Sequence, residues 1–390
     1  MKKLYSIFAL LIAANVTALA DAPDFEYVDL GLPSGTLWAK WNVGATAPQG
    51  FGDYFAWGEV EPYYSSLDPL AWKEGKEDGY AWSSYKYIDA NVFSNSEILE
   101  KGLCVTKYTF ADGQTSGVWY DSEGNFIGDN KTLLEPADDA ATVNWGAGWI
   151  MPSNEQWQEL IDECYSVWTD DYNGTGVAGI IVYATDVEAD KGVYVKSGET
   201  PKESYIIGPD NHIFLPASGY YDGAVLNDGF YGWSASASTD EYSYYCLYPC
   251  LDNGVFGNSR GGRFFGDPVR AVRAKSYTVQ IQQPAENGGI ILEDDDISLA
   301  EGVLERTILH FKADPNDDYE LDEWTGCKAD GTLVVTGNAT VTCSFKPKTT
   351  TAVKNEKADA LKVQKVIENG TMYIIRDGEK YSLQGVKCNE

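Results

Sequence analysis

Residues 145–164 have the sequence WGAGWIMPSNEQWQELIDEC. Ser153 is a favourable N-cap, and Gln156 three residues later completes a capping box. Apolar residues then recur at i, i+3, i+4 and i+7, which places them on one helix face: Trp157, Leu160, Ile161 and Cys164. The sequence therefore predicts an amphipathic helix that packs on a large aromatic surface, with the flanking Trp145 and Trp149 in the core.

The N-terminus has the pattern of a secretory signal peptide over residues 1–20. Lys2 and Lys3 precede an apolar run at residues 7–14, and Ala18-Leu19-Ala20 is a small-residue cleavage site. No later apolar run approaches the length of a membrane span. We therefore expect a secreted or cell-surface protein, associated with the outer membrane and without a membrane span.

The net charge and the histidine content argue against several classes of function. The formal net charge is −30, and a surface this acidic repels phosphate backbones and anionic membranes, which argues against nucleic acid as a partner. The chain has two histidines, His212 and His310, far apart and each within an apolar run. This distribution argues against a histidine-based zinc site and a Ser/His/Asp triad.

The first half of the chain is predicted to consist of short strands and tight turns. Alternating runs between Tyr27 and Glu59 are interrupted by Pro33-Ser34-Gly35 and by several glycines. We expect the insert at residues 63–86, rich in aromatic and charged residues, to be a surface excursion.

Several motifs follow the order seen in one family: residues 27–59, 134–144 (LEPADDAATVN), 145–164, 212–220 (HIFLPASGY), 233–236 (WSAS) and 269–272 (VRAV). Residues 25–275 thereby resemble Bacteroidetes surface proteins with a Fibrobacter-type major paralogous domain. The resemblance implies a fold related to C-type lectins and formylglycine-generating enzymes. It therefore implies an α+β fold class with a C-type-lectin-like domain, and says little about function.

From Lys275 the pattern changes to alternating apolar and polar residues. Residues 276–347 resemble the β-rich bacterial surface repeat of internalin-type proteins, with Asp318 in place of the usual turn glycine. This resemblance implies a spacer or stalk, whose small core we expect Trp324 to hold.

Residues 348–360 (KTTTAVKNEKADA) have no periodic pattern and are predicted to be a linker. After it, Asn369-Gly370 and Asp377-Gly378 are hairpin signals between short strands. Residues 361–390 resemble the C-terminal sorting domain of the type IX secretion pathway, which implies the outer-membrane secretion machinery as a partner. A third small β module is the alternative.

Seven cysteines in an exported chain leave at least one unpaired. Cys327 and Cys343 are the favoured disulfide, and Cys246 and Cys250 are the second candidate pair. Two close cysteines late in this fold also resemble those of a formylglycine-generating enzyme. However, the tyrosines and acidic residues around them raise a thiol pKa, which favours a local disulfide or two buried thiols.

No cofactor is predicted, and a structural calcium ion stays open. Glu135, Asp138 and Asp139, or Asp294 to Asp296, supply clustered oxygen ligands. The calcium signatures of C-type lectins and the EF-hand loop are absent. We therefore expect Asp138 and Asp139 to tie the loop before the helix, and Asp294 to Asp296 to form a solvated turn.

Residues 218–265 are rich in Tyr, Trp, Ser, Asn and Gly, a composition that suits protein ligands and sugar rings. The predicted ligand face consists of Tyr220, Tyr221, Asp222, Trp233, Tyr242, Tyr244, Arg260 and Arg263. The alternative is that many of these aromatic side chains belong to the core.

The sequence therefore predicts an exported adhesin-like protein, without catalytic activity, that binds a glycan or protein ligand at the cell surface. Two alternatives stay open. One is a secreted enzyme on a formylglycine-generating scaffold that uses Cys246 and Cys250. The other is a purely structural surface protein.

Overall fold

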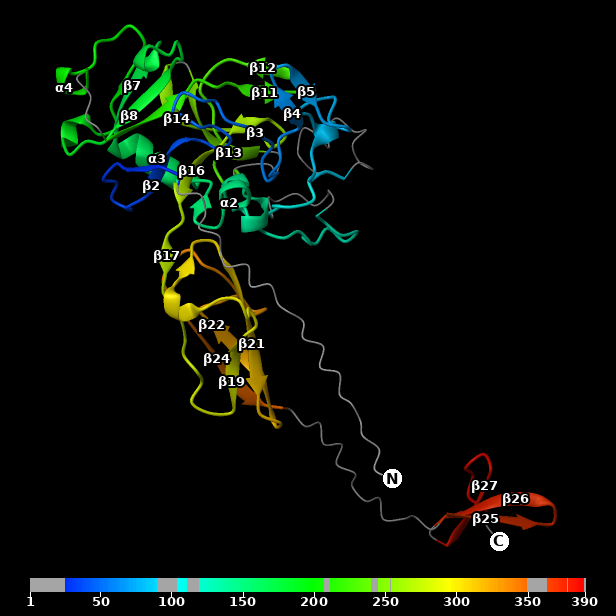
Figure 1. Ribbon diagram of the computed structural model, residues 1–390. Helices are drawn as coiled ribbons and strands as arrows, with labels where there is room; N and C mark the ends of the chain where they lie inside the picture. Colours follow the sequence, from blue (N-terminus) through cyan, green and yellow to red (C-terminus); the bar gives the residue numbers. More distant parts are fainter. Residues whose placement is uncertain are drawn as a thin grey trace, which may run out of the picture.

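The computed structural model describes residues 25–89, 104–110, 119–206, 211–239, 245–252, 254–348, 363–376 and 378–388. The chain is mostly β-sheet, with a minor share of helix. Figure 1 shows an upper body, residues 25–275, that contains the labelled helices, and below it a smaller body of strands, residues 276–348. We call these the N-terminal module and the second module.

Two four-stranded sheets form the frame of the N-terminal module. The first is antiparallel, in the order β1 (Tyr27–Asp29), β2 (Leu37–Asn42), β16 (Arg270–Arg273) and β6 (Trp149–Ile150). The second has the order β10 (His212–Pro216), β8 (Gly179–Tyr183), β7 (Tyr165–Thr169) and β9 (Tyr194–Val195), with β7 and β9 parallel. Because β2 pairs with β16, the beginning and the end of this module lie side by side.

Two-stranded pairs surround this frame: β3 (Tyr54–Phe55) with β15 (Asp267–Pro268), β4 (Tyr64–Leu67) with β5 (Leu70–Trp72), β11 (Tyr220–Asp222) with β12 (Val225–Asn227), and β13 (Tyr245–Asp252) with β14 (Val255–Gly262). Among the described residues, the α-helices are α2 (Ala140–Trp145), α3 (Asn154–Glu163) and α4 (Glu203–Ile206). Short 3₁₀ helices are η1 (Trp82–Ser84), η3 (Pro136–Asp138), η4 (Tyr172–Gly174) and η5 (Glu188–Asp190), with η6 (Leu299–Glu301) in the second module.

The predicted helix is confirmed as α3, including its capping box. Ser153 Oγ accepts a hydrogen bond from Gln156 N at 3.3 Å, and Gln156 Oε1 accepts one from Ser153 N at 2.8 Å. The predicted stripe faces a core built from both four-stranded sheets, where the Trp157 ring lies 4.5 Å from that of Trp38. Trp145 and Trp149 are buried as predicted.

The prediction for residues 63–86 is wrong, because this segment contributes to the core. Tyr63, Tyr64, Tyr80 and Tyr85 are each at most 4% exposed. The rings of Tyr63 and Tyr80 are stacked at 4.3 Å, and the Tyr80 hydroxyl donates to the carbonyl of Tyr54. A tyrosine can bury its ring when its hydroxyl finds a backbone acceptor, so tyrosine content alone does not indicate a surface segment.

The second module has its own small core between two three-stranded sheets. One sheet consists of β18 (Val279–Ile281), β24 (Ala339–Pro347) and β22 (Tyr319–Thr325), the other of β19 (Gly288–Leu292), β21 (Ile308–Pro315) and β23 (Thr332–Val334). A short pair, β17 (Ser276–Tyr277) and β20 (Val303–Leu304), lies at the junction with the N-terminal module. Trp324 is 9% exposed and belongs to this core, as predicted.

The C-terminal residues form a three-stranded sheet: β25 (Val363–Glu368), β26 (Thr371–Arg376) and β27 (Glu379–Ser382). The hairpin predicted at Asn369-Gly370 is confirmed, with φ of 53° and 84° at these residues, as a two-residue hairpin turn requires. Gly378 has φ of 81° in the next hairpin, while Asp377 lies outside the described residues. Among the side chains described in this sheet, none is buried.

Candidate functional site

The predicted ligand face does not form one surface. Trp233 and Arg263 are 0% exposed and Tyr221 is 6% exposed. The Trp233 indole donates to Phe55 O at 2.6 Å, and Trp233 O accepts from the Trp157 indole at 3.2 Å. The prediction of ligand contact is therefore wrong for Trp233, Arg263 and Tyr221, because their side chains are inside the core.

The other predicted ligand residues do not restore that face. Tyr220 is half-buried, while Asp222 and Arg260 are exposed. Tyr242 and Tyr244 lie outside the described residues. What remains of the predicted face is a pair of exposed charged residues and one partly covered ring.

Arg263 has a structural role. Its guanidinium lies 4.7 Å from the ring centre of Trp57 and donates to the carbonyls of Lys107 and Tyr108 at 3.2 and 3.0 Å. An arginine over an indole ring with carbonyl acceptors at its fork is a stable arrangement in a protein interior.

The predicted disulfides are contradicted by the structure. All seven cysteines fall within the described residues, and none of them is in a disulfide, including Cys327 and Cys343, which share the core of the second module. Cys246 and Cys250 lie four residues apart on β13, a separation of about 13 Å along an extended strand, which a disulfide cannot span. Burial raises the pKa of the Cys246 thiol well above its usual value, so this thiol is not activated as a nucleophile.

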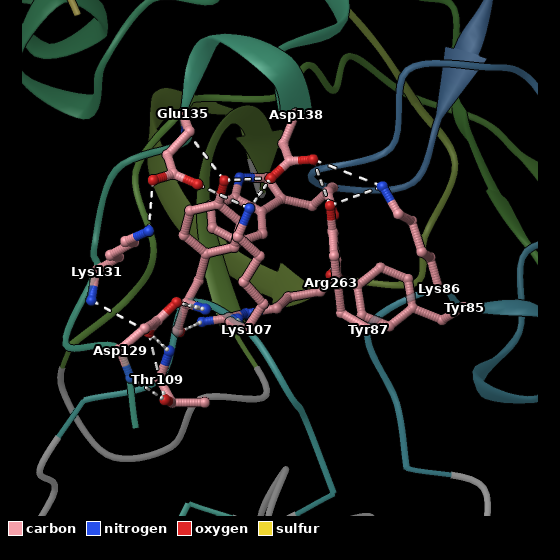
Figure 2. A network of polar contacts seen from close by, with 12 residues as sticks. Tyr85, Lys86, Tyr87, Lys107, Thr109, Asp129, Lys131, Glu135, Asp138 and Arg263 are labelled. Atoms are coloured by element: carbon pink, nitrogen blue, oxygen red, sulfur yellow. Dashed lines mark hydrogen bonds and ion pairs between the residues drawn. The ribbon is translucent and has the colours of Figure 1, made fainter. Parts of the chain in front are cut away.

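A partly buried polar network lies where loops from three parts of the N-terminal module meet (Figure 2). The Lys107 ammonium group contacts Asp138 Oδ2 and lies 2.8 Å from Glu135 Oε2. Tyr108 and Tyr87 donate their hydroxyls to the two oxygens of Asp138. Burial alone would raise the pKa of Asp138, but the hydrogen bonds from Lys107, Tyr108 and Tyr87 outweigh it and lower this pKa.

The same network orders the neighbouring loop. Asp129 accepts hydrogen bonds from the backbone N–H groups of Tyr108 and Thr109, both at 2.8 Å, and Lys131 forms an ion pair with Glu135. Figure 2 shows these groups around Lys107. Each carboxylate drawn there has partners within the protein, so the network has a structural role.

The calcium interpretation of Glu135 and Asp138 has no support in this geometry. The position between the two carboxylates is taken by the Lys107 ammonium group, which a metal ion would have to displace. Within the described ranges, no group of three or more His, Cys, Asp or Glu side chains is arranged to hold a metal. Asp139 accepts hydrogen bonds from the backbone N–H groups of Thr142 and Met151, which confirms that it ties this loop.

The prediction of a solvated turn is confirmed for Asp295 and Asp296 but not for Asp294, whose side chain is 17% exposed. Residues 295 and 296 form an exposed turn, and Asp294 accepts a hydrogen bond from the backbone N–H of His310 at 2.6 Å.

A groove of about 240 Å³ lies beside the polar network, and three lysines line it. We call it the lysine groove; its lining residues are Glu59, Val60, Glu61, Pro62, Tyr63, Lys73, Lys76 and Lys86. The connection between β3 and β4 forms one wall, and residues after β5 and η1 supply the lysines. The backbone bond from Lys73 N to Tyr63 O, 2.8 Å long, holds the two sides together.

Glu59 lies at the base of the groove and contacts the residues around it. Its side chain is 10% exposed, and its Oε1 accepts from the Tyr63 hydroxyl at 2.5 Å and from the Lys86 backbone N–H at 2.8 Å. Its Oε2 lies 3.7 Å from Lys76 Nζ. Both oxygens thus have protein partners, and Glu59 positions the Lys76 ammonium group and the backbone at Lys86.

The three lysines remain open to solution. The side chains of Lys73, Lys76 and Lys86 are 37%, 26% and 53% exposed. Burial lowers the pKa of Lys76, Glu59 raises it, and the neighbouring Lys73 lowers it again, which shows that the two ammonium groups repel each other. Each ammonium group also has a carboxylate nearby: Glu61 at 3.1 Å from Lys73, Glu59 at 3.7 Å from Lys76 and Asp138 at 3.5 Å from Lys86. The groove therefore gathers three partly exposed cations, and an anionic group would bind there by competing with these carboxylates.

Lys86 joins the groove to the network. Its Nζ donates to the Tyr87 hydroxyl at 2.9 Å and lies 3.5 Å from Asp138 Oδ1 (Figure 2). Sequence reasoning missed this site because it assigned the whole segment to a surface excursion. The available signal was a lysine next to an aromatic residue in both Trp72-Lys73 and Tyr85-Lys86-Tyr87.

No family model, no curated protein and no solved structure matches this chain. Within the described ranges, no helix has both the length and the apolar character that crossing a membrane requires.

Proposed function

We propose that this chain is an exported surface protein that binds an acidic ligand through the lysine groove. The observation that carries the proposal is the convergence of three partly exposed lysines in one groove of a chain with net charge −30. On a surface that otherwise repels anions, such a groove is the place where an anionic group gains most.

The proposed location rests on sequence resemblances. A signal peptide at residues 1–20 would direct export, and the likeness of residues 25–275 to a major paralogous domain supports a lectin-like binding module. The likeness of residues 361–390 to a type IX sorting tail supports delivery by the outer-membrane secretion machinery.

The favoured ligand is a glycan that carries carboxylate or sulfate groups; a protein with an acidic loop is the second choice. Ammonium groups bind such anions through charge-assisted hydrogen bonds. Nucleic acid is disfavoured, because a long polyanion binds through many phosphate contacts and would be repelled by a chain with net charge −30.

The test uses the mature chain, residues 21–390, on an array of uronate, sialylated and sulfated glycans with their neutral counterparts. We expect saturable binding to acidic members, weakened by salt because the contacts are ionic. The variant Lys73→Gln/Lys76→Gln should lose roughly tenfold or more in affinity, as expected for two charge-assisted hydrogen bonds.

A matched control removes the same charge elsewhere. Lys40 and Lys346 form exposed ion pairs with Glu26 and Glu320, and neither lines the groove. Lys40→Gln/Lys346→Gln should therefore leave affinity unchanged. Equal binding of neutral and acidic glycans would overturn the acidic-ligand proposal. An array without binding would favour the structural alternative, and turnover of a substrate would favour the enzyme.

A further inference from the structure

Arg306 belongs to the second module, but its guanidinium is buried against the N-terminal module. Its side chain is 2% exposed; Nη1 lies 3.0 Å from Asp139 Oδ2, and Nη2 donates to Met151 O at 2.7 Å. The Asp139 side chain is 1% exposed. A fully buried ion pair therefore connects two modules that each have their own core.

The backbone around Arg306 is shaped to present this side chain. Arg306 lies between β20 and β21 and has φ of 66°, a left-handed conformation that is unfavourable for a residue with a long side chain. Its N–H donates to Val335 O at 2.6 Å, and the preceding Glu305 N–H donates to Lys275 O at 2.7 Å. The surrounding structure thus holds a costly turn that directs Arg306 across the junction.

Asp139 also makes hydrogen bonds within the N-terminal module. Its Oδ1 caps helix α2 by accepting from the N–H groups of Ala141 and Thr142, at 2.9 and 3.0 Å. Its Oδ2 accepts from Met151 N at 2.8 Å, in the segment between β6 and α3. One carboxylate therefore joins α2, the start of α3 and the second module.

Contacts beside the pair come from both modules. A cavity of about 220 Å³ at the junction is lined by residues 130–135 of the N-terminal module and by Arg306, Ile308, Lys328, Val334 and Thr336 of the second. The modules thus meet over an area wider than one ion pair.

We infer that the Arg306–Asp139 pair joins the N-terminal module and the second module into one rigid unit that unfolds cooperatively. The second module then acts as a brace and not as a flexible spacer, and the lysine groove keeps a fixed direction relative to the chain that follows. The physical reason is that Asp139 is fixed in the interior by its hydrogen bonds to α2 and Met151, so loss of Arg306 from the junction leaves a buried carboxylate without its charge partner. This inference does not depend on the ligand of the groove.

The test uses the full mature chain. In the wild type, calorimetry should show one transition for both modules, and hydrogen exchange should show their cores opening together. Arg306→Met leaves Asp139 buried without its charge partner, which should lower the Tm by on the order of 10 °C and separate the two modules' transitions. Tryptic cleavage after Lys275, at the junction, should become at least about tenfold faster.

Two further variants keep the test decisive. Arg306→Lys retains the charge but loses the two-pronged geometry, so it should fold and show an intermediate effect. Arg273→Met is the matched control: the Arg273 guanidinium lies over the rings of Tyr27 and Trp149, in the N-terminal module. Its loss should not separate the transitions.

A double-mutant cycle isolates the pair. Asp139→Asn retains an N-cap acceptor, so Asp139→Asn/Arg306→Met should cost much less than the sum of the single changes. Separate wild-type transitions would overturn the inference. A single transition and unchanged cleavage in Arg306→Met would overturn it as well.

Discussion

Lys76 and Glu59 form a partly buried ion pair at the floor of the lysine groove, with 3.7 Å between Nζ and Oε2. The ammonium group also lies 3.6 Å from the ring centre of Tyr63, whose hydroxyl donates to the same glutamate. One carboxylate thus positions both the cation and the ring below it. The groove is held by interior contacts, although its lysines face solution.

Removal of the Glu59 charge tests this arrangement. In Glu59→Gln, burial, the largest influence on Lys76, and the repulsion from Lys73 remain, while the attraction that raises the pKa of Lys76 is lost. We therefore expect a lower pKa for Lys76, measured by NMR titration of the lysine side chains. Glu61→Gln is the control, because Glu61 is 81% exposed and its pair with Lys73 is weak. A Lys76 pKa that is the same in Glu59→Gln and wild type would show that the pair is open in solution.

Because Asp267 is buried, we predict that the folded state becomes less stable as pH rises. The residue is 1% exposed, its Oδ1 has no hydrogen-bond partner, and burial raises the pKa of its carboxyl well above 3.8. The folded state therefore holds a proton that the unfolded chain releases at lower pH. This contribution is fully present below the unfolded pKa and is lost as pH rises through the folded pKa.

Asp267→Asn cannot ionise, so it should remove that loss. We expect the variant to be more stable than wild type at pH 8, by ~1–3 kcal/mol, and to gain less at pH 4. Urea unfolding at both pH values measures the difference. Asp222→Asn, at an exposed position, should show no such gain. Equal stability differences at the two pH values would show that Asp267 does not titrate as its burial indicates.

Replacement of Trp233 tests whether this residue contributes to the stability of the fold or to ligand binding. Trp233→Phe removes the indole N–H that pairs with Phe55 O, which leaves a buried carbonyl without its donor. We expect a loss of about 1–3 kcal/mol in the free energy of unfolding, measured with urea. Affinity per folded molecule should not change, because Trp233 is 0% exposed. A selective loss of affinity with intact stability would contradict this assignment.

The thiols can be counted directly. Cys327 and Cys388 are partly exposed, whereas the other five cysteines are buried. A thiol reagent should therefore modify at most these two in the native protein and all seven after unfolding without reductant. Fewer than seven thiols in the unfolded protein would show that a disulfide forms, contrary to this structure.

Local signals in the sequence predicted local structure correctly. The capping box of α3, its apolar stripe and the Asn369-Gly370 turn depend on residues within a few positions of each other. Such features follow from backbone sterics and short-range hydrogen bonds, which a single stretch of sequence contains. The burial of Trp324 was also predictable, because a large apolar ring in a short β-rich module is most stable in the small core of that module.

Burial of the tyrosines and the arginines depended on partners far away in the chain. Tyr80 needs the carbonyl of Tyr54, and Arg263 needs Trp57 and the carbonyl of Tyr108. A polar tip is compatible with the interior or with the surface, and its partner decides between them. Composition therefore suggested a ligand face where the fold makes a core.

The sequence alone was enough for the helix, the hairpins and the strongly acidic character of the chain, because each is a property of neighbouring residues or of their sum. The lysine groove and the Arg306–Asp139 pair exist only in three dimensions. Asp139 and Arg306 are far apart in the chain, and nothing local requires them to meet. Their contact arises when the two modules pack and exclude water, which is the step that gives a buried charge its partner.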